Sequence, residues 1–330
     1  MTNLTFDWQI DEFMVYCQSK QLRPKSMQSY EQALRLFQRW CLDTRKIENV
    51  DEVKENDVRR YITDVQQRGK YTFYVNDKQK KTNHPDHRRD YRQKVSVGTI
   101  NNYIRNLKVF FNWLDESYVL KKNPMKNVKQ YKSKHKPKEF LSDESFKKLI
   151  TSLDKSYFPE HRDLTMIVLM FDTGMRLGEC SSLLVTDLDL FGRKILLREE
   201  ETKGCKVRVV YFSAKTEKVL RRWLQFKDRY TETDYVFPSS REKTTHIDVH
   251  GFETSFTKYL RRFNIPEKVS PHCLRNNFAK RCLMNGMDIY TLSKILGHSS
   301  VTVTEEAYLD LNDEDLSMRY QIFSPMEKVK

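Results

Sequence analysis

The sequence predicts a mainly α protein with a small β-sheet, an α+β fold built as two domains. Three observations carry this prediction: apolar residues at helical spacing in the first third, a lysine-rich segment, and two strand-like runs among later helices. A chain of 330 residues is long enough for two hydrophobic cores. We expect an N-terminal domain over residues 1–120, a linker over 121–138 and a second domain over 139–330.

Four amphipathic helices are expected in the N-terminal domain. Apolar side chains recur three and four residues apart, as at Tyr30, Ala33, Leu34 and Phe37. No strand pattern lies between these segments, so they predict a small helical bundle. The expected helices are Trp8–Lys20, Ser26–Cys41, Asn56–Val65 and Thr99–Leu114.

The chain is strongly basic. Its formal net charge is +14 and its isoelectric point about 9.3. Such a surplus favours a polyanionic partner, because phosphate neutralisation gives basic surfaces their affinity, and it indicates nucleic acid. No apolar run reaches the length of a membrane span and no signal-peptide pattern is present, so we expect a cytoplasmic protein without a membrane partner. The six cysteines lack zinc spacing and predict reduced, mostly buried thiols.

A polar, basic insertion at about residues 69–95 separates the third and fourth expected helices. Loops of this length inside compact domains are usually functional or disordered. Two interpretations stay open, a flap or short hairpin that contacts DNA and a flexible solvated loop. Its histidines, His84 and His87, have no nearby thiolates and do not favour a metal site.

Residues 121–138 contain eight lysines and no acidic residue. Repulsion between like charges keeps such a segment extended and outside a core. It is either a solvated linker or, as we favour, a linker that also follows a DNA backbone while the two domains close around the duplex. The lysines expected to contact DNA are Lys121, Lys122, Lys126, Lys129, Lys132, Lys134, Lys136 and Lys138.

The second domain is expected to be mixed. Two strands, Lys194–Arg198 and Val207–Phe212, flank a tight turn at Thr202–Gly204. The expected helices are Ser142–Leu153, Leu164–Phe171, Lys215–Phe226, Gly251–Phe263, Cys273–Asn285, Ile289–Leu296 and Asn312–Phe323.

Five short segments collect side chains suited to attack on a phosphodiester: TGMRLGE (173–179), TKGCKVR (202–208), PHCLR (271–275), LGHSS (296–300) and TEEAY (304–308). Arg176 is expected at a helix start, where backbone N–H groups favour an anion. Its guanidinium can hold two phosphate oxygens, although pairing with Glu179 alone would make it an ordinary surface residue. His272 and Arg275 share one helix face, so both can reach one phosphate.

The expected hairpin is basic, with Lys203, Lys206 and Arg208. A lysine at such a turn is commonly an exposed residue without a role. We interpret Lys206 and Arg208 as DNA contacts, and the apex position of Lys203 suits delivery of a mobile cation to a leaving oxygen.

Together these segments resemble the tyrosine recombinase, or phage integrase, family, particularly its Xer-like and mobile-element members. The resemblance covers nearly the whole chain. The stretch KQLRPKSMQSYEQALRLFQRW (20–40) is similar to the family's core-binding domain, and the chain from about Lys138 onward to its catalytic domain. The fold implied is a helical core-binding domain and a mixed α/β catalytic domain that form a clamp around DNA.

The resemblance also implies the roles of the site residues. Arg176 and Arg275 would clamp the scissile phosphate, with Glu179 orienting Arg176. Tyr308 follows His298 by ten residues, where the family usually has nine, and we expect the extra residue in a turn at Ser300–Glu305. The catalytic set implied is Arg176, Lys203, His272, Arg275, His298 and the nucleophile Tyr308.

The activity implied is site-specific recombination through a 3′-phosphotyrosyl intermediate and a Holliday junction, serving integration, excision or resolution of DNA. No metal and no cofactor is implied. The implied partners are double-stranded DNA at inverted-repeat sites, three further copies in a homotetramer with exchanged C-terminal helices, and accessory DNA-bending or directionality factors at the bacterial nucleoid. Two alternatives stay open: a type IB topoisomerase and a non-catalytic architectural DNA-binding protein.

Overall fold

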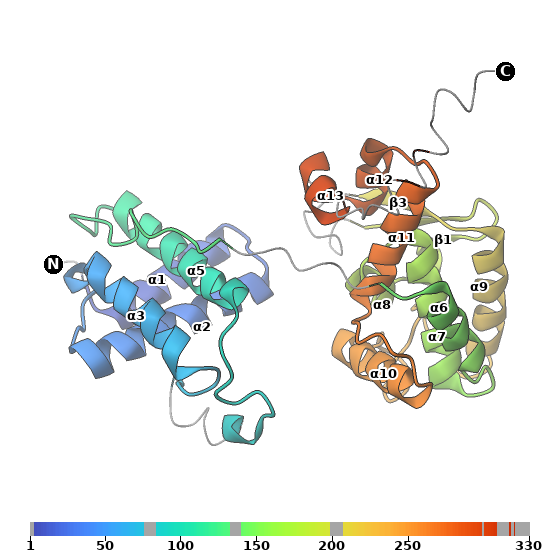
Figure 1. Cartoon of the computed structure of the whole chain (residues 1–330), viewed down its shortest axis with the longest axis horizontal. Helices are drawn as coiled ribbons and strands as arrows, with labels where there is room; N and C mark the ends of the chain where they lie inside the picture. Colours follow the sequence, from blue (N-terminus) through green and yellow to red (C-terminus); the bar gives the residue numbers. More distant parts are fainter. Residues whose placement is uncertain are drawn as a thin grey trace. The chain divides into compact units, whose positions relative to one another are not determined.

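The computed structural model describes residues 3–75, 84–132, 140–198, 207–298 and 300–308, together with Ser317 and Tyr320. The chain divides into two compact units, residues 1–135 and 136–330 (Figure 1). The mainly helical fold with one small sheet confirms the predicted fold class. Among the described residues, no helix has the length and apolar character needed to cross a membrane.

The first unit contains all four helices that the sequence predicted. They are longer than expected by one to three residues at most ends, which lie outside the apolar pattern. Ser96, for example, accepts a hydrogen bond from the backbone N–H of Thr99 and starts the last helix. The helices are α1 (Phe6–Ser19), α2 (Pro24–Trp40), α3 (Glu55–Arg68) and α5 (Val97–Glu116), with short π and 3₁₀ turns at η1 (Cys41–Arg45), η2 (Val50–Glu52) and η3 (Pro85–His87).

Aromatic rings fill the core of this bundle. Phe37, on α2, lies edge-on to Phe6, Tyr61 and Phe111, which belong to three other helices. Edge-to-face pairs of this kind stabilise a core beyond the area they bury. The apolar faces predicted from the sequence therefore pack against one another in this bundle.

The segment 121–138 differs from its prediction. Met125 and Val128 are 0% and 3% exposed and belong to the core of the first unit, although the lysines were expected to keep the whole segment out of a core. The described lysines of the segment, Lys121, Lys122, Lys126, Lys129 and Lys132, stay exposed, so charge and apolar residues separate by face. Lys134, Lys136 and Lys138 lie outside the described residues.

The insertion at 69–95 is anchored where it leaves and rejoins the bundle. Backbone hydrogen bonds from Lys70 N to Gln93 O and from Arg92 N to Lys70 O join its two ends. Gly69 has φ +81°, and a Cβ there would lie 2.5 Å from the carbonyl oxygen of Arg92, so this turn requires glycine. Its described residues form the 3₁₀ turn η3 and turns, without a strand.

The second unit surrounds a buried central helix, α7 (Phe158–Thr173). It packs against α6 (Asp143–Ser152), α8 (Leu177–Ser181), α9 (Ala214–Lys227) and α11 (His272–Met284). Met166, Ile167, Leu169 and Met170 are nearly inaccessible to solvent on successive faces of the helix. The remaining helices are α10 (Val249–Arg262), α12 (Ile289–Leu296) and α13 (Val301–Tyr308), and a 3₁₀ turn, η4 (Val185–Asp187), follows α8.

A three-stranded antiparallel sheet, in the order β1-β2-β3, completes this unit. The strands are β1 (Leu188–Asp189), β2 (Lys194–Leu197) and β3 (Arg208–Tyr211). Leu197 pairs with Arg208 and Lys194 with Tyr211, which confirms the two predicted strands and their antiparallel pairing. The short strand β1 was not predicted, since two residues give no alternation to read.

The stretch that ends at Tyr308 corrects a second expectation. We expected Ser300–Glu305 to form a turn, but Val301–Tyr308 is a helix that packs against α11 and α12. Tyr308 is the last residue of this helix, so the ten-residue spacing from His298 includes a helix rather than the expected turn. The C-terminal helix expected at Asn312–Phe323 lies, apart from Ser317 and Tyr320, outside the described residues.

Gly174 is a position where this fold depends on a missing side chain. It ends α7 with φ +67°, and a Cβ there would lie 2.3 Å from Phe278. We expect Gly174→Ala to lower the free energy of unfolding by about 2–4 kcal/mol, through left-handed strain and overpacking. Gly178→Ala is the matched control: its Cβ meets nothing within 4 Å, and it should be neutral or stabilising by up to about 1 kcal/mol. Equal urea midpoints for both variants would contradict this account.

Candidate active site

Arg275 is a buried cation held by the ends of two helices. Its side chain, on α11, is 2% exposed. Nη1 donates to the carbonyl oxygen of Gly174 at 2.7 Å, and Nη2 donates to that of Leu296 at 2.8 Å. Both carbonyls belong to helix C-termini, where the helix dipole favours positive charge. This arrangement compensates the desolvation of the guanidinium and brings the ends of α7 and α12 together.

His298 lies directly beside this cation. Its Nε2 is 3.0 Å from Nη2 of Arg275, and its Nδ1 is 2.7 Å from Oγ1 of the fully buried Thr304 on α13. Arginine can only donate, so Nε2 accepts, and the neutral imidazole carries its proton on Nδ1. The histidine therefore connects Arg275 to the helix that ends at Tyr308.

Arg176 joins the same group from the start of α8. Its backbone N–H and its Nη1 each donate to the carboxylate of Glu179 at 2.8 Å. Its Nη2 donates to the carbonyl oxygen of Gly297, one residue before His298, at 3.3 Å. The structure thus brings Arg176 together with Arg275 and His298, which follow it by about a hundred residues or more in the sequence.

A second arginine, Arg208 on β3, shares the carboxylate of Glu179. Its Nη1 and Nη2 donate to the two carboxylate oxygens at 2.9 and 2.5 Å, and its Nε donates to the carbonyl oxygen of Ile295. Burial by itself would raise the pKa of Glu179, but the hydrogen bonds and charges of Arg208 and Arg176 outweigh it and hold that pKa below its ordinary value. Glu179 is therefore ionised, and it fixes the direction of both guanidinium groups.

This position of Arg208 differs from the surface role that the sequence suggested. Its side chain is 10% exposed and faces Glu179. The sequence contains no clear signal for it, because Val209 and Val210 are both apolar; in the structure Arg208 shares the face of Val210, which is 0% exposed. Thr304 had no sequence signal, because its contact with His298 depends on where α13 packs.

The remaining site residues are described to different extents. His272 is exposed and begins α11 one turn before Arg275. Tyr308 is the last residue of α13, which packs against α11 and α12, as Figure 1 shows. Lys203 and Lys206 lie outside the described residues, between β2 and β3. No group of three metal-ligating side chains occurs in the part of the chain that the structure describes.

Comparison with known proteins identifies the family of the chain. Residues 139–315, more than half of the chain, match the phage integrase family, and residues 10–74 match its N-terminal SAM-like domain. Tyrosine recombinase XerC of Oceanobacillus iheyensis is 25% identical, with 96% of this chain and 95% of that protein covered. XerC of Listeria monocytogenes (strain EGD-e) is 27% identical, with 90% of each covered.

Solved structures share the fold. The Tn1549 transposon integrase in complex with transposon right end DNA superposes with a TM-score of 0.70, at 17% identity, over 97% of this chain and 100% of that one. The chain therefore belongs to the phage integrase family and is a tyrosine-type site-specific recombinase.

The ion pairs of Glu179 generate a prediction about stability and pH. A folded-state pKa below the ordinary value means that these pairs stabilise the fold above about pH 4.3, and that the contribution is lost as pH falls through the lowered pKa. Glu179→Gln should lose on the order of 3 kcal/mol of unfolding free energy near neutral pH, because it leaves two partly buried arginines without a counter-charge. The difference from wild type should shrink in acid.

The control is Glu217→Gln, which removes a surface pair with Arg221. It should cost less than about 1 kcal/mol. Denaturant titrations at several pH values measure both variants. A deficit of Glu179→Gln that persists unchanged at acidic pH would rule out the ion pairs as its cause.

Proposed function

We propose that this recombinase cleaves DNA by attack of the Tyr308 hydroxyl on a phosphodiester, forming a 3′-phosphotyrosyl enzyme and a free 5′ hydroxyl. The observation that carries the proposal is the cluster of Arg176, Arg275 and His298 at the ends of α7 and α12, with α13 leading from it to Tyr308. Cations held in fixed directions stabilise charge that develops on a phosphate, without reorganising at the moment of reaction.

Each of the two arginines is positioned for this task by the protein. Arg275 is held by two carbonyl oxygens and Arg176 by Glu179, so neither side chain must be ordered when the phosphate arrives. Both guanidinium groups can donate hydrogen bonds to the non-bridging oxygens of the phosphate in the transition state. We also propose that Arg208, rather than contacting DNA, serves as a positioning residue that keeps Glu179 ionised.

The histidines and the lysine move protons in this scheme. A phenol has a pKa of about 10 and needs help to become a nucleophile, so His272 assists proton removal from Tyr308. His298 donates to the phosphate, for which Nε2 must carry a proton and the hydrogen bond from Arg275 must give way. Lys203 protonates the departing 5′ oxygen. The phosphotyrosyl bond conserves the energy that religation of a partner strand requires.

The assembly follows from the proposed chemistry. Exchange of strands between two duplexes through a Holliday junction needs four active sites, and we propose a homotetramer on inverted-repeat DNA with exchanged C-terminal helices. Relatives bound to DNA, such as the Tn1549 integrase with its transposon end, support a DNA partner and a mobile-element role. Accessory DNA-bending factors and a place at the bacterial nucleoid in the cytoplasm belong to the same proposal.

The first test concerns the nucleophile. Tyr308→Phe should abolish covalent adducts with a nicked suicide substrate and leave DNA affinity nearly unchanged, because only the phenolic oxygen is lost. Tyr290→Phe is the control; Tyr290 is 59% exposed on α12 and should keep wild-type adduct formation. Adducts that persist in Tyr308→Phe would assign the nucleophile elsewhere. Absence of adducts in the wild type would favour the non-catalytic alternative, and relaxation of supercoils without exchange between two sites would favour the topoisomerase.

The second test separates a general acid from a DNA contact. Lys203→Ala should slow strand cleavage on ordinary DNA and regain the wild-type rate on a 5′-bridging phosphorothiolate, whose leaving group needs no proton. Lys194→Ala, which removes an exposed lysine of β2, should show no such substrate dependence. If Lys203→Ala is slowed equally on both substrates, Lys203 acts only through binding.

A further inference from the structure

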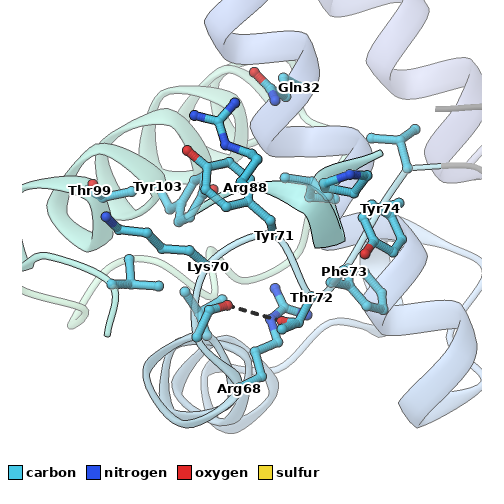
Figure 2. A pocket seen from close by; sticks show the side chains of 16 residues that line it. Gln32, Arg68, Lys70, Tyr71, Thr72, Phe73, Tyr74, Arg88, Thr99 and Tyr103 are labelled. Atoms are coloured by element: carbon cyan, nitrogen blue, oxygen red, sulfur yellow. Dashed lines mark hydrogen bonds between the residues drawn. The ribbon is translucent and has the colours of Figure 1, made fainter. Parts of the chain in front are cut away.

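A large cavity lies in the first unit, far along the sequence from the catalytic residues. Its volume is about 660 Å³, and its walls come from α2, α3, α5 and the described ends of the insertion at 69–95. Figure 2 shows the side chains that surround it. Cavities between about 300 and 1,000 Å³ are typical of sites for small organic ligands. The proposed strand cleavage makes no use of this cavity.

The lining of the cavity combines positive charge with aromatic rings. Arg68, Lys70 and Arg88 contribute cations, which pair with Asp64 and Asp90 outside the lining, and no aspartate or glutamate is among the described residues that line the cavity. Four aromatic rings line the same space, those of Tyr71, Phe73, Tyr74 and Tyr103. Cations without lining acids favour an anion, and flat rings favour a planar apolar group. A ligand that meets both preferences carries an aromatic ring and a negative group.

Two cation–ring pairs give this lining a defined form. The guanidinium carbon of Arg88 lies 4.2 Å from the centre of the Tyr71 ring, and that of Arg68 lies 4.4 Å from the centre of the Phe73 ring. Arginine and tyrosine faces of this kind are surfaces on which nucleobases stack. Gln32 and Thr99, which also line the cavity, can hydrogen-bond to the edge of a base.

The backbone around the cavity is strained. Gly69, Tyr71 and Arg92 have φ of +81°, +60° and +60°, and two of these are not glycines. The hydrogen bonds between Lys70 and both Arg92 and Gln93 hold this conformation, and Lys70 and Arg88 both pair with Asp90 behind the lining. Backbone strain that the surrounding structure maintains is concentrated at ligand sites. These contacts therefore fix the described part of the insertion that lines the cavity.

We infer that this cavity binds a nucleotide whose base is unpaired, with the base stacked among the aromatic rings and its phosphate facing Arg68, Lys70 and Arg88. A paired base shows only its edge in a groove, so a base must leave the duplex to stack on a side chain. The same chemistry has two sources, an extrahelical nucleotide of bound DNA and a free nucleotide. With an extrahelical nucleotide as its ligand, the site would recognise distorted DNA independently of the sequence-neutral affinity proposed for the lysines.

The experiment compares three probes on the full chain carrying Tyr308→Phe, in which the proposed cleavage cannot occur. The probes are a duplex of arbitrary sequence, the same duplex with one unpaired 2-aminopurine nucleotide, and free deoxyadenosine monophosphate with inorganic phosphate as its control. We expect the bulged duplex to bind about tenfold more tightly than the paired one, which corresponds to the stacking of one base on aromatic side chains. The 2-aminopurine fluorescence should change on binding.

Matched variants connect this preference to the cavity. Tyr71→Ala and Arg88→Gln should each remove most of the preference while leaving affinity for the paired duplex within about threefold. Tyr118→Ala is the control for Tyr71, because Tyr118 also has a left-handed backbone (φ +57°), is 96% exposed and does not line the cavity. Arg60→Gln, at an exposed position of α3 outside the lining, is the control for Arg88.

The outcomes distinguish the two sources of the nucleotide and can overturn the inference. Loss of the preference in the cavity variants alone supports an extrahelical nucleotide. Binding of deoxyadenosine monophosphate but not phosphate, lost in the same variants and without a preference for the bulge, supports a free nucleotide. Equal binding of all probes, or equal loss in the control variants, overturns the inference. Because no covalent step is measured, a failure here is separate from a failure of Tyr308 as the nucleophile.

Discussion

The buried guanidinium of Arg275 is the interaction on which the catalytic unit depends. It binds the carbonyl oxygens that end α7 and α12, and it is the neighbour of His298. Removing its charge would leave two helix ends without a partner and the histidine without its donor. In the proposed mechanism the same side chain binds the phosphate, so that structure and chemistry constrain one residue. Gly174 and Gly297 contribute by turning the chain without a side chain, which leaves room for Phe278 beside Gly174 and for Arg208 beside Gly297.

Glu179 extends this constraint from one arginine to three. Its carboxylate binds Arg176 and Arg208, and through Gly297 and Ile295 these two reach the same end of α12 that Arg275 holds. The site is thus one continuous network of charge and backbone dipoles rather than separate pairs. Such a network fixes directions before substrate arrives, and electrostatic preorganisation of this kind is the main source of transition-state stabilisation in phosphoryl and acyl transfer.

The two units hold their arginine side chains in different ways. In the second unit, carbonyl oxygens and a carboxylate hold the cations that we propose to bind the reacting phosphate. In the first, Arg68 and Arg88 each cover one face of an aromatic ring, and these guanidinium groups line a cavity together with the further rings of Tyr74 and Tyr103. Stacking depends mainly on contact area, so the cavity of the first unit tolerates different bases. Hydrogen bonding depends on direction, so the site of the second unit requires one geometry.

The sequence by itself predicted most of the helices and two of the three described strands, and it singled out the side chains that we propose to react. Periods of 3.6 and 2 are local properties, and the order of Arg176, His272, Arg275, His298 and Tyr308 is carried by motifs that need no neighbours to be read. Tertiary structure decided what each group contacts. Arg208 faces inward because Leu197 is its partner in the register, Met125 and Val128 enter a core despite the lysines around them, and Thr304 reaches His298 because α13 packs on α12. These outcomes depend on contacts between residues distant in sequence, and such contacts leave no periodic pattern along a single chain.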